Sequence, residues 1–108
     1  MKSFERRRDN RILMDRPVKV QCEMTGKYLS AQMQNISATG MLMEIQHPSL
    51  LVQGQRLRVG IAWNDQSAIL ASNNMLQAVV VRSAGLGGRQ HVAVHFDERL
   101  SLEMKASA

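Results

Sequence analysis

Apolar and polar residues alternate with a period of two through most of the chain after residue 16. In the first such stretch, 17–24, one face carries Val18, Val20, Cys22 and Met24. Successive side chains of a strand point to opposite faces, so this alternation is typical of a half-buried β-strand. Comparable runs indicate further strands at 28–36, 41–46, 56–63, 76–83 and 91–96.

Turn-forming residues separate these runs. Glycine-containing turns follow the first two strands, and the sequence AGLGG at 84–88 predicts a hairpin loop. The segment AILAS at 68–72 is either a further short strand or an irregular link. In the tail, Leu100 and Met104 have helical spacing. The pattern therefore predicts six or seven short strands and one terminal helix, arranged as an antiparallel barrel or sandwich.

Length and composition set the class of protein. With 108 residues, 44% of them hydrophobic, we expect one domain over 1–108 with a modest core, in which eight methionines act as adaptable filling. Apolar runs fall far short of the ~20 residues that a spanning helix needs. A secretory signal is not visible, and a single cysteine fits a reducing compartment. We therefore expect a cytoplasmic protein without a membrane span.

The positive charge is concentrated near the start of the chain. The formal net charge is +5, and residues 2–19 contribute seven basic and three acidic side chains, hence +4 of it. Such a segment attracts anions, for example nucleotides, nucleic acid or acidic lipid. The alternative interpretation is a solvated tail that aids solubility.

Several candidate chemistries find little support. His91 and His95 are four apart on a strand, roughly 13 Å, too far to share one metal ion. We predict no metal site and place both on a polar strand face. The glycines at 85–88 lack the lysine–hydroxyl pair of a phosphate loop. Ser37 has no recognisable catalytic partner, so we predict no enzymatic activity. Trp63 shares its face with apolar residues and is expected in the core.

Two short motifs remain to be explained. Arg7 and Arg11 have the spacing RxxxR, and Asn35, Ser37 and Gly40 have the spacing NxSxxG. Twenty-three residues lie between Arg11 and Asn35, the length of one hairpin, so the chain can return beside its own start. Each motif alone is weak. Together, in this order and on an all-β chain of this size, they resemble the PilZ domain, a bacterial receptor module for cyclic di-GMP.

The resemblance extends over nearly the whole chain, because 78–83 and 92–98 also look like strands of that family. It implies an all-β fold, a six-stranded antiparallel barrel with a C-terminal helix, and no catalysis. On this basis we expect a flexible arginine-rich arm at 1–12, a barrel at 13–97 and a helix at 98–106. The ligand would be cyclic di-GMP, and no other cofactor is implied.

The resemblance assigns ligand binding to Arg7, Arg11, Asn35, Ser37 and Gly40. Guanine offers O6 and N7 as paired acceptors, which a guanidinium fork engages with two hydrogen bonds. The amide and the hydroxyl can bond a base or phosphate, and the glycine permits positive φ or a close backbone approach. Additional candidates for ligand contacts are Arg6, Arg8 and Arg82.

The hypothesis is a cyclic di-GMP receptor whose arm folds over the ligand and so signals to an effector protein that the sequence does not identify. One alternative is a protein-interaction module of the same fold that does not bind the dinucleotide. The other is a small basic barrel that binds nucleic acid through its arm. With one Trp, one Tyr and two Phe, aromatics for base stacking are scarce, which argues against the last alternative.

Overall fold

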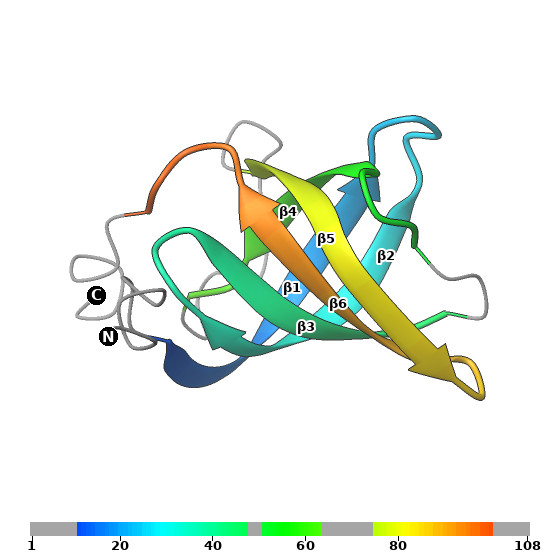
Figure 1. The fold of residues 1–108 in the computed structure, drawn as a ribbon, viewed down its shortest axis with the longest axis horizontal. Helices are drawn as coiled ribbons and strands as arrows, with labels where there is room; N and C mark the ends of the chain where they lie inside the picture. The colour runs from blue at the N-terminus through cyan, green and yellow to red at the C-terminus, as the bar shows by residue number, and fades with distance from the viewer. Residues whose placement is uncertain (1–10, 48–50, 64–74, 101–108) are drawn as a thin grey trace, which may run out of the picture.

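Six strands in the part of the chain that the structure describes form a closed antiparallel β-barrel, drawn in Figure 1. The structure is a computed structural model and describes residues 11–47, 51–63 and 75–100. The strands are β1 (Ile12–Cys22), β2 (Tyr28–Ile36), β3 (Gly40–Gln46), β4 (Arg56–Ile61), β5 (Leu76–Leu86) and β6 (Arg89–Phe96). They follow the order β1-β2-β3-β6-β5-β4, and β4 pairs with β1. Of the two architectures that the alternation allowed, the barrel is confirmed.

The apolar members of each alternating run face the barrel interior. In β1, Val18, Val20 and Cys22 are buried while Lys19 between them is exposed, as the period of two predicts. Met24 is the exception, because β1 ends at Cys22 and a turn follows. Its side chain is 93% exposed, so the prediction that it continues the inward row is wrong.

Methionine and aliphatic side chains fill the interior, as the composition suggested. Met33, Met41 and Met43 are almost completely buried. Trp63 follows β4 and packs, partly buried, against this core, in agreement with the prediction. Burial of one such side chain contributes roughly 1.5–3 kcal/mol, so the interior provides the main driving force for closing the barrel.

The hairpin between β5 and β6 is tighter than the sequence suggested. Gly87 and Gly88 have φ values of 65° and 82°, which permit a two-residue turn that matches the twist of the strands. Leu86 pairs with Arg89 directly beside this turn. Residues 84–86 therefore belong to β5, and the predicted loop over 84–88 is too long.

The described part of the predicted helix at 98–106, residues 98–100, is not helical. Residues 97–100 follow β6 without helical structure. Leu100 donates its backbone N–H to the carbonyl of Ala38 at 2.7 Å, a long-range bond instead of a helical one. Residues 101–106 lie outside the described residues, as do the possible strand at 68–72 and residues 1–10 of the arm. Within the described ranges there is no helix of the length and apolarity that a membrane crossing requires.

Candidate ligand-binding site

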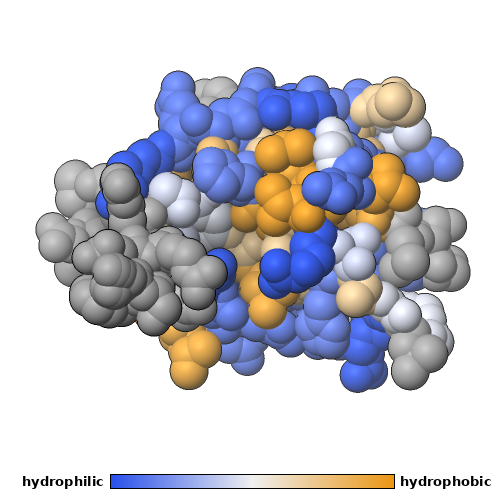
Figure 2. All heavy atoms as spheres, viewed as in Figure 1, coloured by the Kyte–Doolittle hydropathy of each residue, from blue (hydrophilic) through white to orange (hydrophobic). Residues whose placement is uncertain are grey.

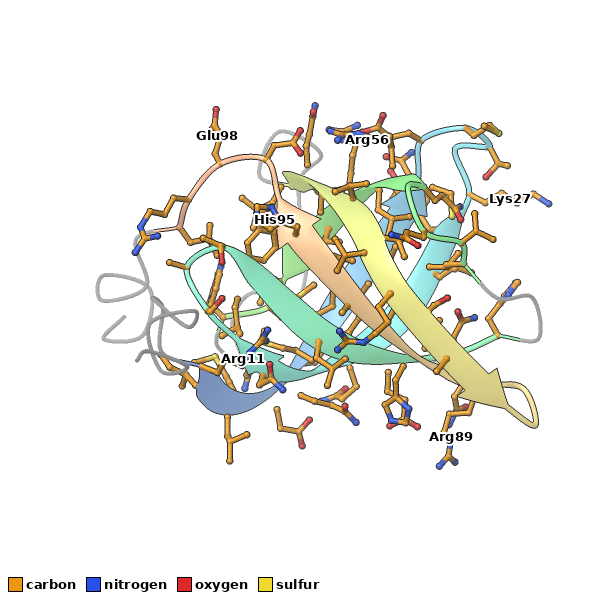
Figure 3. The ribbon with its side chains drawn as sticks, in the orientation of Figure 1. Arg11, Lys27, Arg56, Arg89, His95 and Glu98 are labelled. Atoms are coloured by element: carbon orange, nitrogen blue, oxygen red, sulfur yellow. The ribbon has the colours of Figure 1, made fainter. Side chains whose placement is uncertain are left out.

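The hairpin of β1 and β2 brings Arg11 beside Asn35. β1 begins one residue after Arg11, and Ile12 pairs with Ile36 across the hairpin. Arg11 Nη1 donates a hydrogen bond to Asn35 Oδ1 at 2.9 Å, and the bond lies at the surface. The expectation that the chain returns beside its own start is therefore correct for this arginine, which Figure 3 labels beside the start of β1.

A β-bulge in β2 turns Asn35 toward the outside of the barrel. Met33 pairs with Met43, but Asn35, two residues later, pairs with Leu42, only one residue away in β3. The extra residue in β2 is Gln34, and such a bulge re-aims the side chains that follow it. Met33 faces the interior, and without the bulge Asn35 would face the same way.

Ser37 is buried within its own turn. Its side chain is 4% exposed, and the residue follows the end of β2. Ser37 Oγ accepts from the backbone N–H of Thr39 at 3.3 Å and lies 3.4 Å from the carbonyl oxygen of Gly40. The hydroxyl thus organises the turn, an arrangement common for serine in tight turns.

Gly40 starts β3 where two backbones approach each other. A Cβ atom at this position would overlap the carbonyl oxygen of Val94 in β6, closer than side-chain carbons lie in proteins. Its φ does not lie in the left-handed region, unlike that of Gly26. Of the two reasons that the sequence offered for this glycine, close approach is the correct one.

The segment after β6 holds the turn from the other side. Phe96 donates its backbone N–H to the carbonyl of Thr39 at 2.7 Å, and Leu100 packs against the core. Asp97, the residue after Phe96, forms an ion pair with Arg56 of β4. The hydrogen bond between the two side chains raises the pKa of the arginine. The NxSxxG turn therefore has backbone partners on β6 and beyond it, which fixes its position relative to Asn35.

The remaining predicted ligand residues are not gathered at this point. Arg82 is exposed on β5, which is separated from β2 by β3 and β6. Arg6, Arg7 and Arg8 lie outside the described residues. Sequence reasoning also missed Leu13, which pairs with Asn35 and is 86% exposed. Its position beside the site follows only from the register of β1 against β2.

Both histidines of β6 are exposed on the outer face, as predicted for surface positions. His91 pairs with Glu44 and His95 with Gly40, so they belong to different rows of the sheet. Among residues 11–47, 51–63 and 75–100, no group of three His, Cys, Asp or Glu side chains could hold a metal ion.

The fold is that of a small antiparallel barrel domain, and the sequence specifies its family. The family model for the PilZ domain matches residues 5–107. The chain therefore belongs to the PilZ domain family. A comparison with curated proteins finds no match to the sequence.

Solved structures with the same fold include the following three. The inhibitor of motility MotI/DgrA of Bacillus subtilis has a TM-score of 0.68 at 19% identity, covering 93% of this chain and 46% of that protein. The PilZ domain of YcgR from Escherichia coli, solved with c-di-GMP, has a TM-score of 0.62 at 15% identity, with 85% and 78% covered. The PilZ domain of CeSA from a cellulose-synthesizing bacterium has a TM-score of 0.55 at 19% identity, with 91% and 89% covered. The chain thus spans less than half of MotI/DgrA, and at these identities the likeness concerns the fold.

Proposed function

We propose that this PilZ domain is a non-enzymatic receptor for cyclic di-GMP. The observation that carries the proposal is the hydrogen bond between Arg11 and Asn35, because it joins the RxxxR motif to the NxSxxG motif on one surface. The family match and the c-di-GMP in the YcgR structure support the choice of ligand.

The Arg11–Asn35 pair prepares both side chains for a guanine. A guanidinium has five N–H donors, and the bond to Asn35 uses one of them at Nη1. The remaining donors can engage O6 and N7 of guanine as a fork, while the amide oxygen keeps a lone pair for a guanine N–H. The same bond orients the guanidinium before the ligand arrives, which lowers the entropic cost of binding.

Arg7 is the proposed second arginine of the site, with Arg6 and Arg8 as additional phosphate contacts. In this proposal the segment that carries them closes over the bound dinucleotide and replaces a cationic surface with a partly neutralised one. An effector protein then recognises the closed form. The roles proposed for Ser37 and Gly40 are to hold the turn that carries Asn35, since the hydroxyl bonds within the turn and the glycine lies against β6.

Isothermal titration calorimetry with cyclic di-GMP tests the proposal. We expect micromolar or tighter binding by the natural chain and a loss of at least tenfold for Arg11→Ala, the loss of about one forked arginine contact. Arg89→Ala is the matched control, because this arginine is exposed and pairs with Glu44 at the far end of β6. If the natural chain produces no binding heat in low salt, the proposal fails and the interaction-module alternative replaces it.

A further inference from the structure

The register of four strands places Asn35 and Arg82 at the two ends of one row on the outer face. Asn35 pairs with Leu42, Leu42 pairs with Ala93, and Ala93 pairs with Arg82. Directly paired residues of a sheet lie on the same face, and three strand spacings amount to roughly 14 Å. We call these four residues the outer row.

Two bulges at the same level of the barrel produce this row. In β2 the bulge at Gln34 turns Asn35 outward, as described above. In β5 the register shifts between Val80 and Arg82, so Arg82 pairs with Ala93 instead of continuing the inward alternation of Val80. Each bulge interrupts an inward row and re-aims one polar side chain to the outside. Bulges are over-represented next to functional sites, so a bulge at each end of a single row indicates a surface that is shaped for binding.

The middle of the outer row is apolar, and its side chains project little from the sheet. Ala93 is 9% exposed and carries only a methyl group, and Leu42 beside it is partly buried. Val81, in the β5 bulge, adds a 42% exposed side chain. Figure 2 shows apolar side chains at the centre of this face with hydrophilic ones around them. Apolar side chains with a few hydrogen-bonding groups beside them are the usual lining of a small-molecule site.

Arg82 lacks a partner within the described residues, in contrast to the other arginines there. Arg56 pairs with Asp97, Arg89 with Glu44, and Arg11 with Asn35, while Arg82 is exposed and has no hydrogen bond or ion pair in that part of the chain. Glu44, the carboxylate of β3 on this face, is already occupied by Arg89. No described residue therefore occupies the guanidinium fork of Arg82, which can bond a ligand on this face.

We propose that the outer row is the subsite for the second purine of the bound dinucleotide, with Arg82 as the residue that selects guanine. This proposal rests on the proposed function. The base lies against Leu42 and Ala93, and its O6 and N7 accept hydrogen bonds from Arg82, while the first guanine occupies Arg11 and Asn35. Adenine carries an amino group in place of O6, so it presents a donor to the donors of arginine.

The test compares cyclic di-GMP with 3′,3′-cyclic GMP–AMP, which has one adenine, by calorimetry on the full chain. The natural chain should prefer cyclic di-GMP by about tenfold or more, because one subsite must otherwise accept adenine. Arg82→Gln should lose about tenfold for cyclic di-GMP and lose or reverse the preference for it, because a glutamine amide can bond N6 and N7 of adenine. Arg82→Lys keeps the charge and a donor without the fork, so it should bind cyclic di-GMP more weakly but keep part of the preference for guanine.

The control Arg89→Gln removes a cation from the same sheet face and should keep the affinity and the selectivity of the natural chain. If Arg82→Gln binds both ligands like the natural chain while Arg11→Ala loses binding, the receptor function stands and the outer-row subsite is wrong. If the natural chain binds neither dinucleotide, both proposals fail. Thermal melting of each variant shows whether the barrel remains folded. A binding loss in an unfolded Arg82→Gln variant is not counted, and the affinity of Arg82→Lys, the more conservative change, then decides.

Discussion

Gly40 at the start of β3 lies directly against the backbone carbonyl of Val94 in β6. The two strands are neighbours in the barrel, and Gly40 pairs with His95. A side chain at Gly40 would have to move backbone, since the overlapping atom is a carbonyl oxygen. The glycine of the NxSxxG motif is therefore required by the packing of β3 against β6, before any ligand is considered.

Asparagine substituted for this glycine should destabilise the barrel. We expect Gly40→Asn to lower the free energy of unfolding by about 1–3 kcal/mol, the range for forcing atoms into a well-packed region. Gly26→Asn is the matched control: φ is +76° there, no atom lies within 4 Å of a built Cβ, and asparagine tolerates this conformation. Urea unfolding measures both. Equal stability of the two variants would show that β3 and β6 can separate at no cost.

Gln90 of β6 ties two segments of the chain to the barrel from a completely buried position. Its Oε1 accepts from the backbone N–H of Leu51 at 3.0 Å, and its Nε2 donates to the carbonyl of His47 at 3.3 Å. Gln90→Leu keeps the volume but leaves both backbone groups without this partner, so we expect a loss of about 1–3 kcal/mol in urea unfolding. Gln46→Leu, at an exposed position of β3, should change stability by less than about 0.5 kcal/mol. A stable Gln90→Leu variant would mean that water satisfies these groups.

The strands were predictable because burial on one face imposes a period of two, which is a local property. The direction of Asn35 was not predicted, because the alternation through Met33 assigns it to the interior. A signal was present in the sequence: Met33 and Ile36 are both apolar although three residues apart, and burying both requires one extra residue in the strand. The tail helix at 98–106 was predicted from the spacing of Leu100 and Met104 and from the family resemblance, and at 98–100 the chain instead makes a long-range bond from Leu100 to Ala38.

The candidate site, like the fold, was predictable from the sequence only in part. The two motifs and the hairpin length between them were sufficient to bring Arg11 to Asn35. The relation of Asn35 to Arg82 depends on three successive registers between strands that are distant in sequence. Register is decided by core packing and turn geometry over the whole barrel, so a local pattern does not contain it.

Cys22 gives the barrel a predictable alkaline sensitivity. Burial raises the pKa of its thiol above the ordinary value, so the folded state keeps the proton to higher pH than the unfolded state. The contribution is complete below the unfolded pKa of about 8.5 and is lost as pH rises toward the folded value. Urea unfolding should therefore show stability that falls above about pH 8.5. The fall should be weaker in Cys22→Ala, and an identical slope in both proteins would contradict the assignment.

The native thiol should also react slowly with a disulfide reagent and quickly in urea.

Arg11 should matter for ligand binding far more than for stability. Its bond to Asn35 lies at the surface, where the net contribution of a hydrogen bond is at most about 1 kcal/mol. We therefore expect Arg11→Ala and Asn35→Ala each to leave the urea midpoint nearly unchanged while weakening cyclic di-GMP binding at least tenfold. Because both side chains are proposed to engage the same guanine, the double variant should lose less binding energy than the sum of the single variants. Strictly additive losses in calorimetry, or a large shift of the urea midpoint, would mean that the two residues do not act as one binding unit.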